Sequence, residues 1–148
     1  MSKIAFCFPG QGSQRVGMGR DMAREFPEAA AVFDEASEEV DFDLRKVCFD
    51  GPIDRLSETD ITQPALVTAS LAALRAVQGR LGLSEDKVVT NVDRFGNTSA
   101  ASIPICLDEA HADGRIKAGD VVLMTGFGGG LSWGSCVMEW TLPQKEAR

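Results

Sequence analysis

The sequence predicts an α/β fold, in which helices pack on a mixed sheet and a helical insertion lies near the N-terminus. A continuous apolar run over Lys3–Pro9 is typical of a strand buried on both faces. Between Met18 and Val40, apolar side chains recur three and four residues apart, as on a helix that buries one face. Two further strand candidates, Val121–Thr125 and Leu131–Trp140, flank the glycine-dense segment GFGGG and are expected to pair as a hairpin. Because a tight turn makes such a pair antiparallel, the sheet is expected to be mixed.

Proline and capping residues place further helices in the first half of the chain. Pro27 is expected to break or restart the first helix, because its ring is poorly tolerated inside a helix. A short helix is expected over Asp43–Phe49. Thr59 or Asp60 is expected to cap a long helix that runs from about Gln63 and is apolar nearly all round.

The second half continues with shorter elements. Gly82 is a suitable terminator for the long helix. The β-branched residues of Lys87–Val92 predict a strand, and Ser99–Ala112 predicts a helix with one apolar face.

The composition is that of a globular protein. The chain has 148 residues, of which 44% are hydrophobic and 25% are charged. Its net charge of −7 disfavours binding to a nucleic-acid backbone. No apolar run reaches the roughly 18 residues of a membrane span, and the first residues lack a signal-peptide pattern. A cytoplasmic protein with no membrane or nucleic-acid partner is therefore expected.

The four cysteines, Cys7, Cys48, Cys106 and Cys136, are widely spaced and form no CxxC pair. Neither a metal site nor a disulfide framework is expected from such spacing. Each thiol has apolar neighbours and is predicted to be a small buried hydrophobic group. No metal and no redox cofactor are predicted.

Two motifs in the first half resemble a known family. GQGSQ at positions 10–14 follows the first strand, and TQPAL at positions 62–66 lies in the long helix. On these motifs and their separation, about Lys3 to Val77 resembles the start of malonyl-CoA:acyl-carrier-protein transacylases. The resemblance implies that Gln11 lines the active site and that its backbone helps to form an oxyanion hole, and that Gln63 lines the same pocket. By spacing alone, GQGSQ is equally a plain turn between a strand and a helix.

Two motifs in the second half resemble another family. GNTSAAS at positions 96–102 and GFGGGLSWGS at positions 126–135 are similar to the C-terminal end of β-ketoacyl-acyl-carrier-protein synthase III. The similarity runs from about Arg80 to Trp140 and implies a thiolase-like half-fold. It implies that Asn97 belongs to a Cys-His-Asn catalytic set, that the backbone of Gly129 contributes to an oxyanion hole, and that Phe127 lies by the same pocket. Asn97 as an ordinary loop or capping residue is the alternative.

Both families' nucleophiles and histidines are missing from this sequence. No GxSxG elbow follows the transacylase-like segment, and ITQPALV stands where the synthase has its HQAN histidine. Cys106 and Cys136 do not match the synthase nucleophile, and the only histidine, His111, matches neither base. The vestigial catalytic residue is therefore Asn97, without the thiolate that would form an acyl-enzyme.

One composite domain over residues 1–148 is expected, with a transacylase-like segment at 1–78, a synthase-like segment at 79–141 and a tail at 142–148. The join falls near Val77 to Arg80, inside a helix, and the sheet is expected to be built around the three C-terminal strands. The predicted function is an acyltransferase of fatty-acid synthesis by descent, catalytically incomplete, with malonyl-CoA, acyl-CoA or acyl carrier protein as partners. Whether it is an enzyme is left open. The alternative is a non-catalytic module that binds these partners or has no ligand, and apolar patches left by missing segments predict a homo-oligomer.

Overall fold

The computed structural model describes residues 2–7, 12–96, 98–127 and 133–144. The chain divides into two compact units. The helical unit is Gln11–Gly82, and the sheet unit combines Met1–Gly10 with Leu83–Arg148. The boundary at Gly82 lies shortly after the predicted join, and the expected single composite domain stays a prediction. Within the described residues, no helix is long and apolar enough to cross a membrane.

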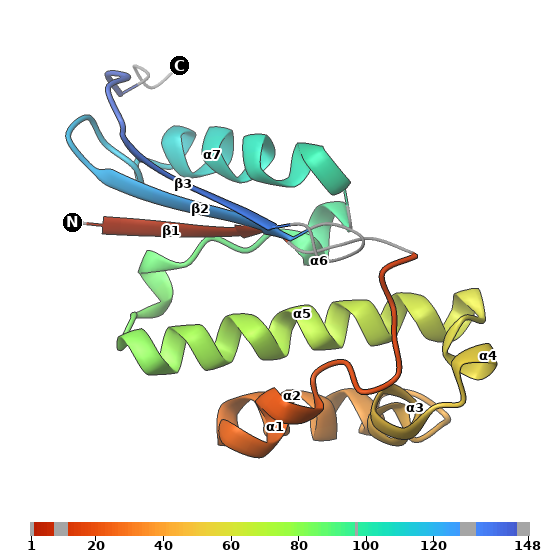
Figure 1. Cartoon of the computed structure of the whole chain (residues 1–148). Helices are drawn as coiled ribbons and strands as arrows, with labels where there is room; N and C mark the ends of the chain where they lie inside the picture. The colour runs from red at the N-terminus through yellow and green to blue at the C-terminus, as the bar shows by residue number, and fades with distance from the viewer. Residues whose placement is uncertain (1, 8–11, 97, 128–132, 145–148) are drawn as a thin grey trace. The chain divides into compact units, whose positions relative to one another are not determined.

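The sheet unit contains a mixed sheet of three strands (Figure 1). β1 (Ser2–Cys7) pairs in parallel with β2 (Val121–Phe127), and β2 pairs antiparallel with β3 (Trp133–Glu139). The mixed sheet and the hairpin-like final pair are therefore confirmed. The third strand was expected from the C-terminal half, but it is the N-terminal strand β1 that pairs with β2.

The predicted strand over Lys87–Val92 is wrong. The segment forms a short 3-10 helix, η1 (Glu85–Lys87), then a single bridge residue, Val88, and α6 (Val92–Phe95). The guanidinium of Arg115 donates to the carbonyl oxygen of Val88 at 3.0 Å. The Arg115 side chain thus bonds to the Val88 carbonyl, which in a regular strand would accept from a neighbouring strand. Val88 is buried but belongs to no regular strand.

One further helix covers the sheet. η2 (Ser99–Ala101) leads into α7 (Ser102–Ala112), which contacts β1. The core of the sheet unit is formed by four buried residues, with Val89, Leu107 and Met124 packed around them. The four are Ala110, Ile116, Val122 and Trp140.

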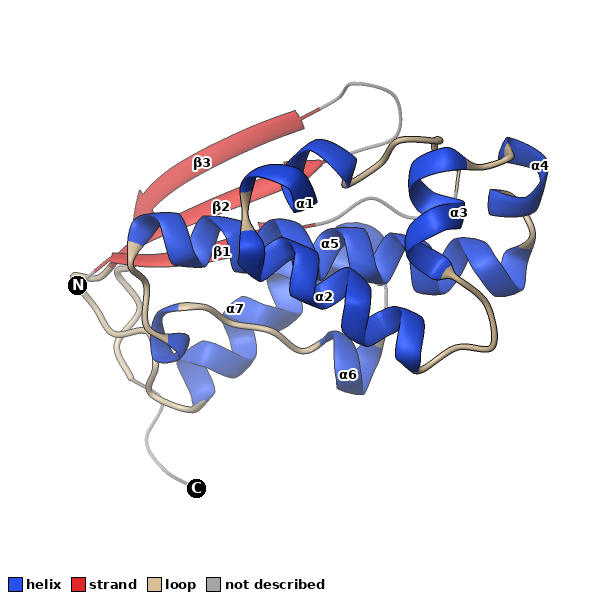
Figure 2. Ribbon diagram, turned by 90° about the horizontal axis from the view of Figure 1, so that it is seen from below, coloured by secondary structure: helices blue, strands red, loops and turns tan. Residues whose placement is uncertain are grey.

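The helical unit is built on a long helix, α5 (Thr59–Leu81), with α2 (Pro27–Glu38) lying beside it (Figure 2). Gly82 ends α5 in the left-handed conformation, as predicted. The start of α5 differs from the prediction: it begins at Thr59, and its cap is Glu58, which makes no side-chain capping bond. The hydroxyl of Thr62 donates to the carbonyl oxygen of Leu56 at 2.6 Å, which ties the first turn to the preceding helix.

Four shorter helices precede α5, and Pro27 restarts the chain as a helix at the first position of the second. They are α1 (Arg20–Glu25), α2 (Pro27–Glu38), α3 (Leu44–Asp50) and α4 (Ile53–Leu56).

Phe33 is the largest fully buried side chain of the helical unit. Its ring meets Phe49 edge-on, with ring centroids 4.9 Å apart. Gly19 must be glycine for two reasons: its φ is 79°, and a Cβ there would lie 2.4 Å from the Phe33 ring. The buried Phe33 ring thus restricts the residue that precedes α1 to glycine.

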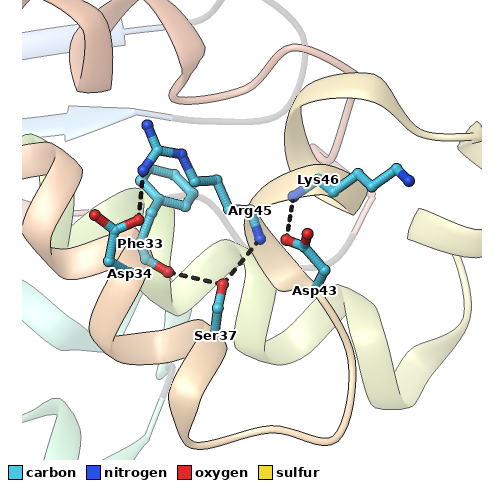
Figure 3. Close-up of polar contacts among 6 residues, drawn as sticks. All are labelled: Phe33, Asp34, Ser37, Asp43, Arg45 and Lys46. Carbon is cyan, nitrogen blue, oxygen red and sulfur yellow. Dashed lines mark hydrogen bonds and ion pairs between the residues drawn. The ribbon is translucent and has the colours of Figure 1, made fainter.

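Polar contacts join α2 to α3 (Figure 3). The Ser37 hydroxyl donates to the Phe33 carbonyl at 2.8 Å and accepts from the Arg45 N–H at 3.1 Å. Asp43 caps α3 by accepting from the Lys46 N–H at 2.8 Å, and Arg45 pairs with Asp34. These contacts hold the turn between the two helices, so the network is structural.

Candidate functional site

The parallel pairing of β1 and β2 makes the strands that precede two of the motifs end side by side. The last paired residues are Cys7 and Gly126, so both strands finish side by side. GQGSQ follows β1 along the chain, and GFGGG begins in the last residues of β2. We call this the carboxyl end of the sheet, where α/β proteins commonly bind ligands.

α7 brings a third motif toward the same end. Its penultimate residue, His111, accepts a hydrogen bond at Nδ1 from Nε1 of Trp140 at 3.2 Å, and the Trp140 N–H donates to the carbonyl of Asp120. Since Asp120 directly precedes β2, the C-terminal end of α7 lies where β2 starts. The helix rises about 16 Å over its length, so the start of α7 lies toward the carboxyl end of the sheet (Figure 1).

Glu109 holds the segment before the GNTSA motif. Its carboxylate accepts from Asn91 Nδ2 at 2.8 Å and from both terminal nitrogens of Arg94, at 2.5 and 3.0 Å. The bonds from Asn91 and Arg94 lower the pKa of the Glu109 carboxyl. They tie α6 and the residue before it to α7. Thr98 Oγ1 and Ser102 Oγ are 2.8 Å apart.

The expected site residues are distributed as follows. Gln11, Asn97 and Gly129 lie outside the described residues. Phe127 is the last residue of β2, at the carboxyl end. Gln63 is exposed on α5 in the helical unit. The predicted roles of these five residues stay predictions.

His111 lies buried in the sheet unit, beside Trp140. It is 4% exposed, and its ring lies 5.4 Å from that of Trp140. Its Nδ1 is engaged by the Trp140 indole, at the end of α7 remote from Ser102. This placement fits a satisfied core histidine.

The described thiols differ in exposure. Cys48 and Cys106 are buried, as predicted, but Cys136 is exposed on β3, so that part of the prediction is wrong. Burial raises the pKa of the Cys48 thiol to about 12. A thiol with that pKa is almost wholly protonated at neutral pH and is a poor nucleophile. Among the described residues, no group of three or more His, Cys, Asp or Glu could hold a metal ion.

Sequence reasoning missed the Glu109 contacts. Asn91 and Arg94 lie 18 and 15 residues before Glu109, so no local spacing joins them. The one usable signal was their proximity to GNTSA along the chain.

Comparison with known proteins gives two kinds of relative. The family model described as "3-Oxoacyl-[acyl-carrier-protein (ACP)] synthase III C terminal" matches residues 54–140, which is more than half of the chain. The match starts before the predicted join and includes α5. The synthase III of Clostridioides difficile is 49% identical over 87 residues, which are 59% of this chain and 26% of that relative.

Solved structures of transacylases also resemble the chain. An acyl carrier protein S-malonyltransferase from Vibrio cholerae has a TM-score of 0.51 and 48% identity, over 57% of this chain and 27% of the other. A structure of a malonyl-transacylase in complex with a type II polyketide synthase acyl-carrier protein matches with a TM-score of 0.53 and 30% identity, over 82% of this chain and 42% of that one.

The chain spans about a quarter of the length of the first of these relatives. Its two resemblances, to a transacylase and to synthase III, are both supported. By the extent of the family match, the chain belongs to the 3-oxoacyl-acyl-carrier-protein synthase III C-terminal family, and a segment similar to malonyl-CoA:acyl-carrier-protein transacylases is joined to it.

Proposed function

We propose that this chain is an acyltransferase of fatty-acid synthesis by descent whose catalytic site is incomplete. The observation that carries the proposal is the position of His111, the single histidine of the sequence. A general base must lie within about 3 Å of the group it deprotonates. The Nδ1 of His111 instead accepts from Trp140, at the end of α7 opposite the GNTSA motif.

The available nucleophiles support the same proposal. The sequence has no GxSxG elbow, and the Cys48 thiol is buried with its pKa raised to about 12. Without an activated serine or thiolate, no acyl-enzyme forms, and only binding and oxyanion contributions remain.

The test is an acylation assay with labelled malonyl-CoA and acyl carrier protein, with a full-length transacylase as the positive control. We expect no transfer above the rate without enzyme, for the wild type and for Gln11→Ala alike. Robust transfer by the wild type that is lost in Gln11→Ala would overturn the proposal.

A second candidate function is a non-catalytic module that binds acyl-CoA or acyl carrier protein. The pairing of Cys7 with Gly126 favours it, because the strands that lead to both glycine-rich segments end together. Glycine-rich backbone can approach a ligand closely and present N–H groups to it.

Calorimetry with malonyl-CoA tests this second candidate. We expect binding heat from the wild type and a loss of that heat in Gly129→Val, since a branched side chain would block close approach. Gly134→Ala is the matched control, because a Cβ at Gly134 meets no atom within 4 Å. No heat at millimolar malonyl-CoA would dispose of thioester binding.

We also propose a cytoplasmic location. The thiols of Cys48 and Cys136, which form no disulfide, support it, because reduced thiols persist in a reducing compartment.

A further inference from the structure

β3 (Trp133–Glu139) is an exposed strand of the sheet unit. It pairs with β2 on one side, and no described strand lies on its other side. Residues 134–139 are all exposed, with Val137 at 65% and Met138 at 37%. Neighbouring residues of a strand point to opposite faces, so exposed residues lie on both faces of β3.

The backbone of β3 also has an open edge. The Trp140 N–H donates to Asp120, and the Trp140 carbonyl accepts from Gly119, both at 2.8 Å. Because backbone groups alternate sides along a strand, the N–H and C=O of Val137 and Glu139 point away from β2. Such an edge is a template for another strand unless Lys, Pro or a bulge protects it. The segment from Trp133 to Glu139 contains neither Lys nor Pro.

We propose that β3 pairs antiparallel with β3 of a second copy of this chain, about a two-fold axis at Cys136. Cys136 is the middle of the seven residues of the strand, so this register pairs both strands over their full length. The groups of Cys136 face β2, which makes the two cysteines a non-hydrogen-bonded pair. The sheet would then run continuously through both copies.

Charge and side chains favour a second copy over an unrelated strand. Glu139 is the only charged residue of the strand, and the two-fold axis places the two carboxylates about 20 Å apart, at opposite ends of the pair. The two Val137 side chains become diagonal neighbours about 7–8 Å apart, which covers the most exposed apolar residue of β3. This inference does not depend on the proposed function.

Oxidative cross-linking of the folded full-length chain tests the register. Diamide takes two electrons and two protons from a pair of thiols and leaves a disulfide. Opposed residues of a non-hydrogen-bonded pair have Cα atoms about 4.5 Å apart, within the span of a disulfide. We expect a covalent dimer from the wild type and none from Cys136→Ala.

A second cysteine variant controls for random collision. Met138→Cys in the Cys136→Ala background puts a thiol on the same face of the same strand. In the proposed register, the introduced thiols of the two copies are four residues apart along the strands, or about 13 Å, so we expect no cross-link. Cross-linking as fast as that of Cys136, or no cross-linking of the wild type, would overturn the proposal.

Light scattering after size-exclusion chromatography, over a series of protein concentrations, tests the association itself. We expect a dimer that Val137→Lys weakens roughly tenfold or more, because lysine on an edge strand opposes pairing and brings like charges together. Val137→Thr keeps the branched shape without the charge and should dimerise like the wild type. Circular dichroism checks that both variants fold. A monomer at every concentration, or a dimer that Val137→Lys leaves unchanged, would contradict the inference.

Discussion

Glu109 joins α7 to α6 through its carboxylate. Its carboxylate accepts from Asn91 and Arg94 at once, and these bonds hold the pKa of the carboxyl below its usual value. A carboxyl whose pKa is lower in the folded than in the unfolded chain stabilises the fold only while it is ionised. Its stabilisation is therefore present above the pKa of the unfolded group, about 4.3, and is lost as the pH falls through the lower, folded value.

Replacing the carboxylate tests this pH dependence. Glu109→Gln keeps the size of the side chain but removes its charge, so we expect a lower melting temperature at about pH 7 and a difference that shrinks toward about pH 3. Tryptophan fluorescence measures the melt. Asp41→Asn, which removes an exposed carboxylate in the helical unit, is the matched control and should change little. A difference for Glu109→Gln that stays constant with pH would show that the charge is not its source.

Elements with strong local signals were predictable from the sequence. Pro27 at the start of α2, Gly82 at the end of α5 and the antiparallel pair β2 and β3 all rest on backbone chemistry that neighbouring residues impose. Other elements depend on contacts between residues far apart in the sequence. Val88 and its neighbours have strand-like side chains, but Arg115, which is 27 residues away, takes the Val88 carbonyl.

The candidate site was less predictable than the fold, for the same physical reason. The motifs indicated which segments to consider. Only the register of β1 on β2 shows that the strands before two of these motifs end at the same end of the sheet. Glu109 and its partners have no local pattern. Cys136 was expected to be buried because its neighbours are apolar, yet sequence does not reveal that β3 takes an outer position in the sheet.

At the scale of the whole chain, the two resemblances do not coincide with the two units. The helical unit, Gln11–Gly82, runs a few residues past the end of the transacylase-like segment. The sheet unit pairs β1 of that segment with β2 of the synthase-like one, and β2 in turn pairs with β3. Backbone pairing thus connects a strand of one segment with a strand of the other. Each unit has its own buried core, which raises the question of whether they unfold together.

A core substitution in the helical unit answers that question. Phe33 is fully buried and packs against Phe49, so Phe33→Ala is expected to lower the free energy of unfolding of the helical unit by about 3–5 kcal/mol. Both tryptophans, Trp133 and Trp140, belong to the sheet unit, so their fluorescence reports on that unit. Far-ultraviolet circular dichroism follows mainly the helices α1 to α5.

In urea titrations of Phe33→Ala, we expect the midpoint of the dichroism signal to fall while the tryptophan midpoint stays near that of the wild type. Val122→Ala, in the core of the sheet unit, is the converse control and should move the tryptophan midpoint instead, because Val122 is 1% exposed and packs with Trp140. Coincidence of the two probes in the wild type and both variants is a standard sign of a single cooperative transition. That result would contradict independent unfolding and support one composite domain over residues 1–148.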